Sequence, residues 1–172
     1  MINKEYYFVR MKTKFTFKAF LLPIVLIAIL CLIIFILPDF FISPDYNDKI
    51  FVKIFVPTIM ISSFLLLFFL EFKTKCIIVI FNTKEIIVKQ FFGLIIKKYS
   101  HSEIEGWKYS HQSDNGGTYE VIFLYNKKNK VINVSQSYHR NYLKLKDYIQ
   151  NNFNHLGYEK FSYINEFKEM FK

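Results

Sequence analysis

The sequence is poor in the residues from which most catalytic and metal sites are built. Its 5 glycines do not have the spacing of a phosphate-binding loop, a dinucleotide fingerprint or a serine nucleophile elbow. The 2 cysteines, Cys31 and Cys76, are too few for a disulfide framework and match no zinc motif, so we expect two reduced, inert thiols. The 4 histidines are scattered. We therefore expect no enzyme, no metal site and no cofactor.

Two long apolar runs near the N-terminus are the most informative feature that is present. They are Ala19 to Pro38 (AFLLPIVLIAILCLIIFILP) and Ile54 to Leu70 (IFVPTIMISSFLLLFFL), and neither contains Asp, Glu, His or Arg. About 20 apolar residues cross about 30 Å of hydrocarbon as a helix. The second run reaches this length if Lys53 snorkels toward the headgroups. We predict that residues 1–72 form a juxtamembrane segment and a transmembrane helical hairpin, with spans at about 17–38 and 50–72.

Each run has an alternative interpretation. The first run resembles the core of a signal peptide, but it is longer than the usual stretch of about 7–15 residues and no small-x-small cleavage site follows it. The second run could be a core helix of a soluble fold, but few residues remain to bury it. The transmembrane hairpin is the prediction that we keep.

The charged residues around the runs predict the orientation of the hairpin. Positive flanks belong on the cytoplasmic side. We therefore place both termini in the cytoplasm and the short acidic connection outside. The richness in Ile, Lys, Asn and Phe suggests an AT-rich bacterial genome, so we expect the membrane to be a bacterial inner membrane. The cations lie before the first run (Lys4, Arg10, Lys12, Lys14, Lys18) and after the second (Lys73, Lys75), whereas the connection holds Asp39, Asp45, Asp48 and Lys49.

From residue 73 onward the pattern is that of short strands separated by turns. After the last strand, Tyr142, Leu145, Ile149 and Phe153 follow at helical spacing, and residues 162–171 predict a second short helix. The fold class that we predict is α+β: the hairpin, then an antiparallel β-barrel or roll over residues 73–172, capped by a C-terminal helix. The six predicted strands are Lys75–Phe81, Glu85–Phe91, Leu94–Ser100, Glu103–His111, Thr118–Tyr125 and Lys130–Ser135.

The order of these segments resembles the bacterial pleckstrin-homology-like membrane proteins, over about residues 17–153. The resemblance lies in an apolar strand that ends in a basic residue, a turn with glycine, a second basic strand, and a polar step into the next strand. It implies a bent antiparallel sheet closed by a helix, which serves as a binding platform for lipids, peptides or proteins. The matching segments are Ile86–Lys89, Phe92-Gly93, Leu94–Tyr99 and Ser102–Trp107.

A basic surface is the first candidate site. Residues 73–172 contain sixteen Lys or Arg and nine Asp or Glu, a net charge of about +7. Each well-placed cation beneath an anionic leaflet contributes about 1 kcal/mol of attraction. The alternative is an ordinary solvated surface, and no nucleic-acid recognition motif is visible. The residues that we predict to face a lipid or a partner are Lys97, Lys98, Lys127, Lys128 and Lys130.

Three weaker candidates each have a structural alternative. The glycine-rich loop beside His111 and Asp114 (Asn115-Gly116-Gly117) offers backbone amides for an anion, or is an ordinary hairpin turn. His101 with Glu103 and Glu105 lines a pocket, or these residues are surface groups. Trp107 floors a groove, or packs in the core.

We expect a membrane-anchored cytoplasmic binding or scaffold module that contacts a protein partner or the anionic inner leaflet. The alternative is an interaction subunit, or a toxin-neutralising protein of the immunity type, that acts through its transmembrane hairpin. The first hypothesis tolerates replacement of the spans and the second does not. A homo-oligomer is compatible with both.

Overall fold

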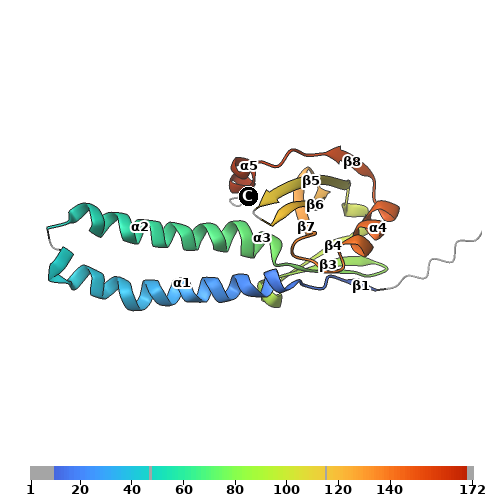
Figure 1. Cartoon of the computed structure of the whole chain (residues 1–172). Helices are drawn as coiled ribbons and strands as arrows, with labels where there is room; N and C mark the ends of the chain where they lie inside the picture. The colour runs from blue at the N-terminus through green and yellow to red at the C-terminus, as the bar shows by residue number, and fades with distance from the viewer. Residues whose placement is uncertain (1–9, 47, 115, 170–172) are drawn as a thin grey trace, which may run out of the picture.

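A computed structural model describes residues 10–46, 48–114 and 116–169 (Figure 1). Two long helices form a hairpin at one end of the molecule, and the β-strands gather at the other. The first helix is α1 (Phe17–Ile42) and the short helix η1 (Pro44–Tyr46) follows it. The second helix runs without a break from Ile50 to Lys75, as α2 (Ile50–Leu66), the π-helical segment η2 (Leu67–Phe72) and α3 (Lys73–Lys75).

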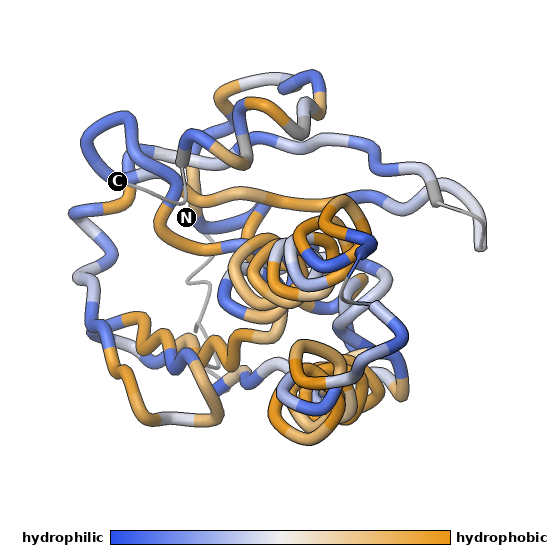
Figure 2. The backbone as a smooth tube through the Cα atoms, turned by 90° about the vertical axis from the view of Figure 1, so that its left-hand side faces the viewer, coloured by the Kyte–Doolittle hydropathy of each residue, from blue (hydrophilic) through white to orange (hydrophobic). Residues whose placement is uncertain are grey.

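Both long helices are apolar enough to cross a membrane, as the sequence predicts. Each has 26 residues, which corresponds to a length of about 39 Å. Large apolar side chains such as Phe17, Phe35 and Phe51 are exposed along them, and only Ala19, Leu22 and Leu26 of α1 are buried. Figure 2 shows the two helices as mostly orange, hydrophobic coils. Helices that are apolar on all sides suit a lipid surrounding better than water.

The strands form two four-stranded sheets. The first has the order β1-β2-β3-β4 and is antiparallel, with β1 at Met11–Lys12, β2 at Ile78–Phe81, β3 at Glu85–Gln90 and β4 at Ile95–Ser100. The second has the order β7-β6-β5-β8, with β5 at Gly106–Asp114, β6 at Gly117–Asn126, β7 at Asn129–Ser135 and β8 at His155–Tyr158. The short helices η3 (Phe91–Gly93) and η4 (His101–Glu103) follow β3 and β4.

The prediction of six strands is confirmed, and of the two predicted arrangements, barrel or roll, the described residues form no closed barrel. The strand after β4 would have to pair with it to close a barrel. Instead β5 pairs with β6 on one side and, in parallel, with β8 on the other. Both sides of β5 are therefore occupied, and β4 and β7 remain sheet edges in the described part of the chain.

The core lies between the two sheets and the helix α4 (Tyr142–Asn152). Leu145 and Ile149 of α4 are fully buried and belong to the same apolar cluster as Phe81 and Leu124. This confirms the helical spacing seen in the sequence. A short helix, α5 (Tyr163–Glu169), follows β8 inside the predicted range 162–171.

The hairpin is joined to the sheets by several direct contacts. The Thr16 hydroxyl donates to the carbonyl of Ser137 at 2.8 Å, and the Tyr138 hydroxyl donates to the Glu71 carboxylate at 2.7 Å. Lys75 forms an ion pair with Glu71 within the helix, at 2.7 Å, and its Nζ atom lies 5.9 Å from the centre of the Tyr138 ring. Residues 1–9 of the predicted juxtamembrane segment lie outside the described residues, but β1 shows that the segment before α1 also adds a strand. Both ends of the hairpin therefore meet the sheets at the same end of the molecule (Figure 1).

Candidate functional site: a basic cavity between two sheet edges

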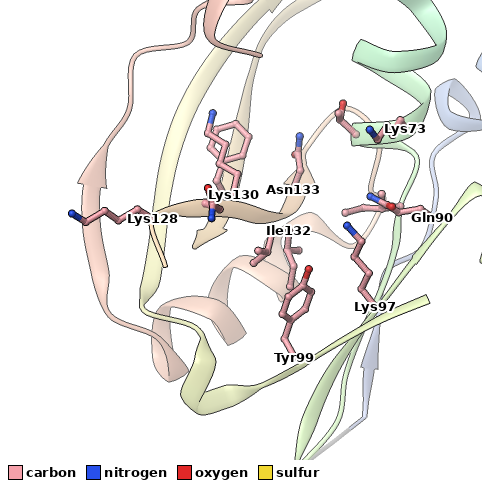
Figure 3. Close-up of a pocket in the computed structure, with 13 residues that line it drawn as sticks. Lys73, Gln90, Lys97, Tyr99, Lys128, Lys130, Ile132 and Asn133 are labelled. Carbon is pink, nitrogen blue, oxygen red and sulfur yellow. The ribbon is translucent and has the colours of Figure 1, made fainter. Parts of the chain in front are cut away.

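A cavity of about 570 Å³ lies between the edge strands β4 and β7, where the sheets do not join (Figure 3). Its walls come from both sheets and from the end of the second long helix. Four lysines line it and no carboxylate does, among the residues that the structure describes. The lining residues are Lys73, Thr74, Ile77, Gln90, Lys97, Tyr99, Phe123, Lys128, Asn129, Lys130, Val131, Ile132 and Asn133.

Strand alternation decides which of the predicted lysines reach the cavity. Successive side chains of a strand point to opposite faces. Lys97 and Tyr99 therefore share the face of β4 that lines the cavity. Lys98 does not line it, and its Nζ atom lies 3.4 Å from a Glu85 carboxylate oxygen on the neighbouring strand β3.

The sequence prediction thus contained three of the four cavity lysines. Lys97, Lys128 and Lys130 line the cavity, although the Lys128 side chain points away from the other two in Figure 3, whereas Lys98 and Lys127 are not among the lining residues. Lys73 completes the set and was missed. Its closeness to the end of the second apolar run was the available signal, but only the folded chain brings that end against β7.

Lys130 is held in place by its own contacts. Its Nζ atom lies 2.7 Å from a Glu159 carboxylate oxygen and 4.3 Å from the centre of the Phe123 ring. Burial alone would raise the pKa of the Glu159 carboxyl, but hydrogen bonds from Lys130 and Tyr125 and the nearby lysine charges outweigh it and hold that pKa below its ordinary value. The Glu159 carboxylate therefore stays ionised at neutral pH.

Lys97 and Lys128 make no ion pair with any residue that the structure describes. Nothing on the cavity wall compensates their charges. An anion in this space would meet the Lys97 ammonium group, which points into the cavity in Figure 3, and could form a charge-assisted hydrogen bond with it.

Asn133 supplies an amide to the cavity wall. The side chain is only 8% exposed, and its amide oxygen has no hydrogen-bond partner among the described residues. A buried polar group without a partner costs free energy, and the oxygen and nitrogen of an amide exchange places by a simple rotation. The amide is therefore suited to contact a polar ligand, whether it accepts or donates.

The turn that carries Lys128 has an unusual backbone. It joins β6 to β7 at the pair Asn126 and Asn129, with Lys127 at φ 48° and Lys128 at φ 66°. Two positive φ angles in a row define a type I′ turn, for which Asn-Gly is the preferred sequence. Lysine has no intrinsic advantage in this conformation, so these two side chains are present for a reason other than turn geometry.

The structure gives the other predicted residues structural contacts. Glu103 accepts a hydrogen bond from the Ser100 backbone at 2.7 Å, and Glu105 accepts one from the Lys128 backbone at 3.3 Å. The His101 ring stacks on Phe153. None of these three residues lines the basic cavity. In the glycine-rich loop, Asn115 lies outside the described residues.

Trp107 is buried beside a second, more open cavity of about 510 Å³. Its ring centre lies 4.4 Å from that of His155, and its indole nitrogen has no partner among the described residues. The wall of this cavity carries the ion pair between Lys146 and Glu120 at 2.7 Å. The charges on this wall are therefore already balanced, unlike those of the basic cavity.

Across the described part of the chain, no three His, Cys, Asp or Glu side chains are grouped so as to hold a metal ion. Cys31 is exposed on α1 and Cys76 is buried next to α3. Comparison of the chain with known protein families, with curated proteins and with solved structures finds no match.

Proposed function

We propose that this chain is a membrane-anchored, non-catalytic binding module whose basic cavity holds the phosphate group of an anionic lipid. The observation that carries the proposal is that Lys73, Lys97, Lys128 and Lys130 all line one cavity, with no carboxylate among its described lining residues. Lys73 belongs to the end of a helix that is long and apolar enough to cross a membrane. The cavity therefore lies beside the surface from which that helix would emerge.

The length of the helix supports this depth. About 39 Å of helix exceeds a hydrocarbon core of about 30 Å, so its last turns reach the headgroup region. Glu71, Lys73 and Lys75 are the charged residues of these turns. A cavity lined by Lys73 is then at the level of lipid phosphates, where each cation contributes about 1 kcal/mol of attraction.

The positive flanks of the spans place this cavity, in our proposal, at the cytoplasmic leaflet of a bacterial inner membrane. We also propose that the sheets and α4 form a pleckstrin-homology-like domain, as the sequence resemblance implies. This proposal is supported by two mainly antiparallel sheets that enclose a core with α4. Action through the hairpin, on a protein partner or as a toxin-neutralising subunit, stays the alternative prediction.

Native mass spectrometry of the full-length protein in detergent tests the proposal. The probes are short-chain phosphatidylglycerol and, as the uncharged comparison, phosphatidylcholine. We expect selective binding of phosphatidylglycerol, weakened about 30-fold by the double substitution Lys97→Gln and Lys128→Gln, which removes about 2 kcal/mol of attraction.

The matched control removes the same charge elsewhere. Lys84 and Lys144 are exposed and do not line the basic cavity. Their double substitution by Gln should leave phosphatidylglycerol binding within about twofold of the unaltered protein. Equal weakening by both double variants would show a diffuse charge effect, and an absence of lipid selectivity would contradict the proposal outright.

A further inference from the structure

The turn between β3 and β4 exposes a run of large apolar side chains. Residues 91–96 read FFGLII, and we call them the apolar turn. Leu94 is 88% exposed, Phe92 is 55% exposed and Ile96 is 53% exposed. Isolated exposed apolar residues are ordinary on protein surfaces, but a contiguous group marks a site of contact with another protein or with a membrane.

The backbone of the apolar turn does not account for its composition. Phe91 and Phe92 have φ angles of 49° and 57°, in the left-handed region that bulky residues rarely adopt. Asn or Gly would fit this conformation with less strain. Aromatic side chains at two such positions indicate that their contacts outweigh their backbone preference.

The inner side of the apolar turn packs against the second long helix. The Phe91 ring lies 5.4 Å from the ring of Phe68 and 5.6 Å from that of Phe72, and the Phe92 ring lies 5.8 Å from that of Phe72. In Figure 1 the turn is the short yellow-green coil at the level of the first turns of α1. It therefore sits where the helices leave the sheets, with its outer side uncovered.

The position of the turn identifies what covers it. Phe68 and Phe72 lie in the last two turns of a helix long enough to cross the hydrocarbon, so they mark the boundary between acyl chains and headgroups. A turn that touches both rings lies at the same depth. Lys97 follows directly after Ile96 and would reach the phosphates, as basic residues do in other interfacial segments.

A second copy of the chain fits this surface less well. The exposed edge of β4 carries Lys97 and Lys98 immediately after the apolar residues. Edge-to-edge pairing of two β4 strands would bring these lysines close to their equivalents, and charged edge residues discourage such pairing. A lipid leaflet can contact both groups at once, because its acyl chains suit the apolar residues and its phosphates suit the lysines.

We infer that the apolar turn inserts into the acyl-headgroup boundary of the leaflet beside the sheets, as a third membrane contact in addition to the two spans. The inference rests on the proposed membrane anchoring, but it does not depend on the basic cavity. It predicts that the turn contacts acyl chains even in a bilayer without anionic lipid.

Quenching of tryptophan fluorescence by brominated lipids tests this inference. Trp107 is the sole tryptophan of the chain, so Trp107→Phe gives a silent background. Into it we would place Leu94→Trp, or Leu143→Trp as a control that is 69% exposed on α4. The full chain is reconstituted in phosphatidylcholine brominated near the headgroup end of the acyl chains. We expect clear quenching and blue-shifted emission for Leu94→Trp, and neither for Leu143→Trp.

A third variant separates this inference from the membrane anchoring. Phe35→Trp places the reporter on an exposed position of α1. Phosphatidylcholine that is brominated deep in the acyl chains should quench it. Quenching of Phe35→Trp together with a Leu94→Trp signal no greater than the Leu143→Trp control would overturn the inference and leave the anchoring intact. No quenching at all would overturn both. Protection of Leu94→Trp from a soluble quencher, without quenching by bromolipid, would indicate a second copy and also overturn the inference.

Cysteine labelling repeats the measurement with Trp107 in place. Cys31→Ser removes the exposed native thiol, and Cys76 is buried, with its pKa raised by burial to about 12, so it resists labelling. Leu94→Cys and Leu143→Cys then carry a fluorophore that reports polarity. The same difference between the two positions is expected, and equal, water-like emission from both would overturn the inference.

Discussion

Replacing the two lysines of the β6–β7 turn by its preferred residues should raise stability and lower lipid binding at the same time. The change is Lys127→Asn together with Lys128→Gly. Both lysines have positive φ angles, a conformation that Asn tolerates and Gly adopts freely. The two effects have separate origins, because the backbone angles affect folding and Lys128 is one of the charged residues that line the cavity.

The expected magnitudes follow from these two origins. A left-handed backbone costs an L-residue about 1–2 kcal/mol, and the greater entropy of the unfolded chain with glycine offsets about 0.5–1 kcal/mol of the gain. A net gain of about 1 kcal/mol raises the melting temperature of a chain of this size by about 2–4 °C. The loss of one or two cations weakens binding of an anionic lipid by about 5-fold to 30-fold.

Both quantities can be measured on the full-length protein in detergent. Emission from Trp107, which is buried in the sheet core, follows thermal unfolding, and native mass spectrometry with phosphatidylglycerol follows binding. The single variants separate the contributions, because Lys128 lines the cavity and Lys127 does not. Lys127→Asn should therefore stabilise with the smaller loss of binding.

Two results would refute this reasoning. A double variant that melts at a lower temperature would show that the lysines stabilise the turn. A double variant that melts higher but binds phosphatidylglycerol as well as the unaltered protein would show that the cavity does not use this turn.

Three further predictions concern stability and orientation. Buried His139 accepts the Ser135 amide at Nδ1 and donates from Nε2 to the Ile77 carbonyl, both at 3.1 Å, so His139→Ala should cost about 3 kcal/mol in thermal or denaturant unfolding. Burial also lowers the pKa of His139, and this effect outweighs that of the neighbouring Ile77 and Ser135 carbonyl oxygens, which raise it. Because the unfolded chain gains this proton near pH 6.5 and the folded chain does not, the melting temperature should fall below that pH, with a smaller slope in His139→Gln. Gly106→Ala places a Cβ atom 2.3 Å from the Asn154 carbonyl oxygen, so it should displace β8 and cost about 1–3 kcal/mol in the same assay. A reporter that is active only outside the membrane should stay inactive when fused after Lys172, and strong activity would reverse the proposed orientation.

The sequence predicts the fold wherever local pattern decides it. The six predicted strands are rich in β-branched and aromatic residues, and α4 has apolar residues at helical spacing, so both were found. The strands β1 and β8 were missed because they have only 2 and 4 residues, too few for a pattern to stand out, and they become strands only by pairing with distant segments. The open barrel follows from the same long-range pairing, since β8 occupies the side of β5 that closure would need.

Some residues of the candidate site could likewise be predicted from local pattern, and others depend on long-range contacts. Lys97, Lys128 and Lys130 are visible as dense basic positions on strands and a turn. Lys73 and Asn133 become part of the site only when α3 is placed against β7, and no local pattern records that contact. The positive φ angles of Phe91 and Phe92 are equally hidden, since phenylalanine is not a signal for a left-handed turn.

The contacts among Thr16, Ser137, Tyr138, Glu71 and Lys75 have a mechanical consequence. Because Thr16 before α1 and both Glu71 and Lys75 at the end of the second helix contact the segment after β7, the hairpin and the sheets turn together. Helices about 39 Å long adapt to bilayers of different thickness by tilting. In the proposed setting, each change of tilt rotates the basic cavity toward or away from the phosphates, so bilayer thickness itself becomes an input to lipid binding.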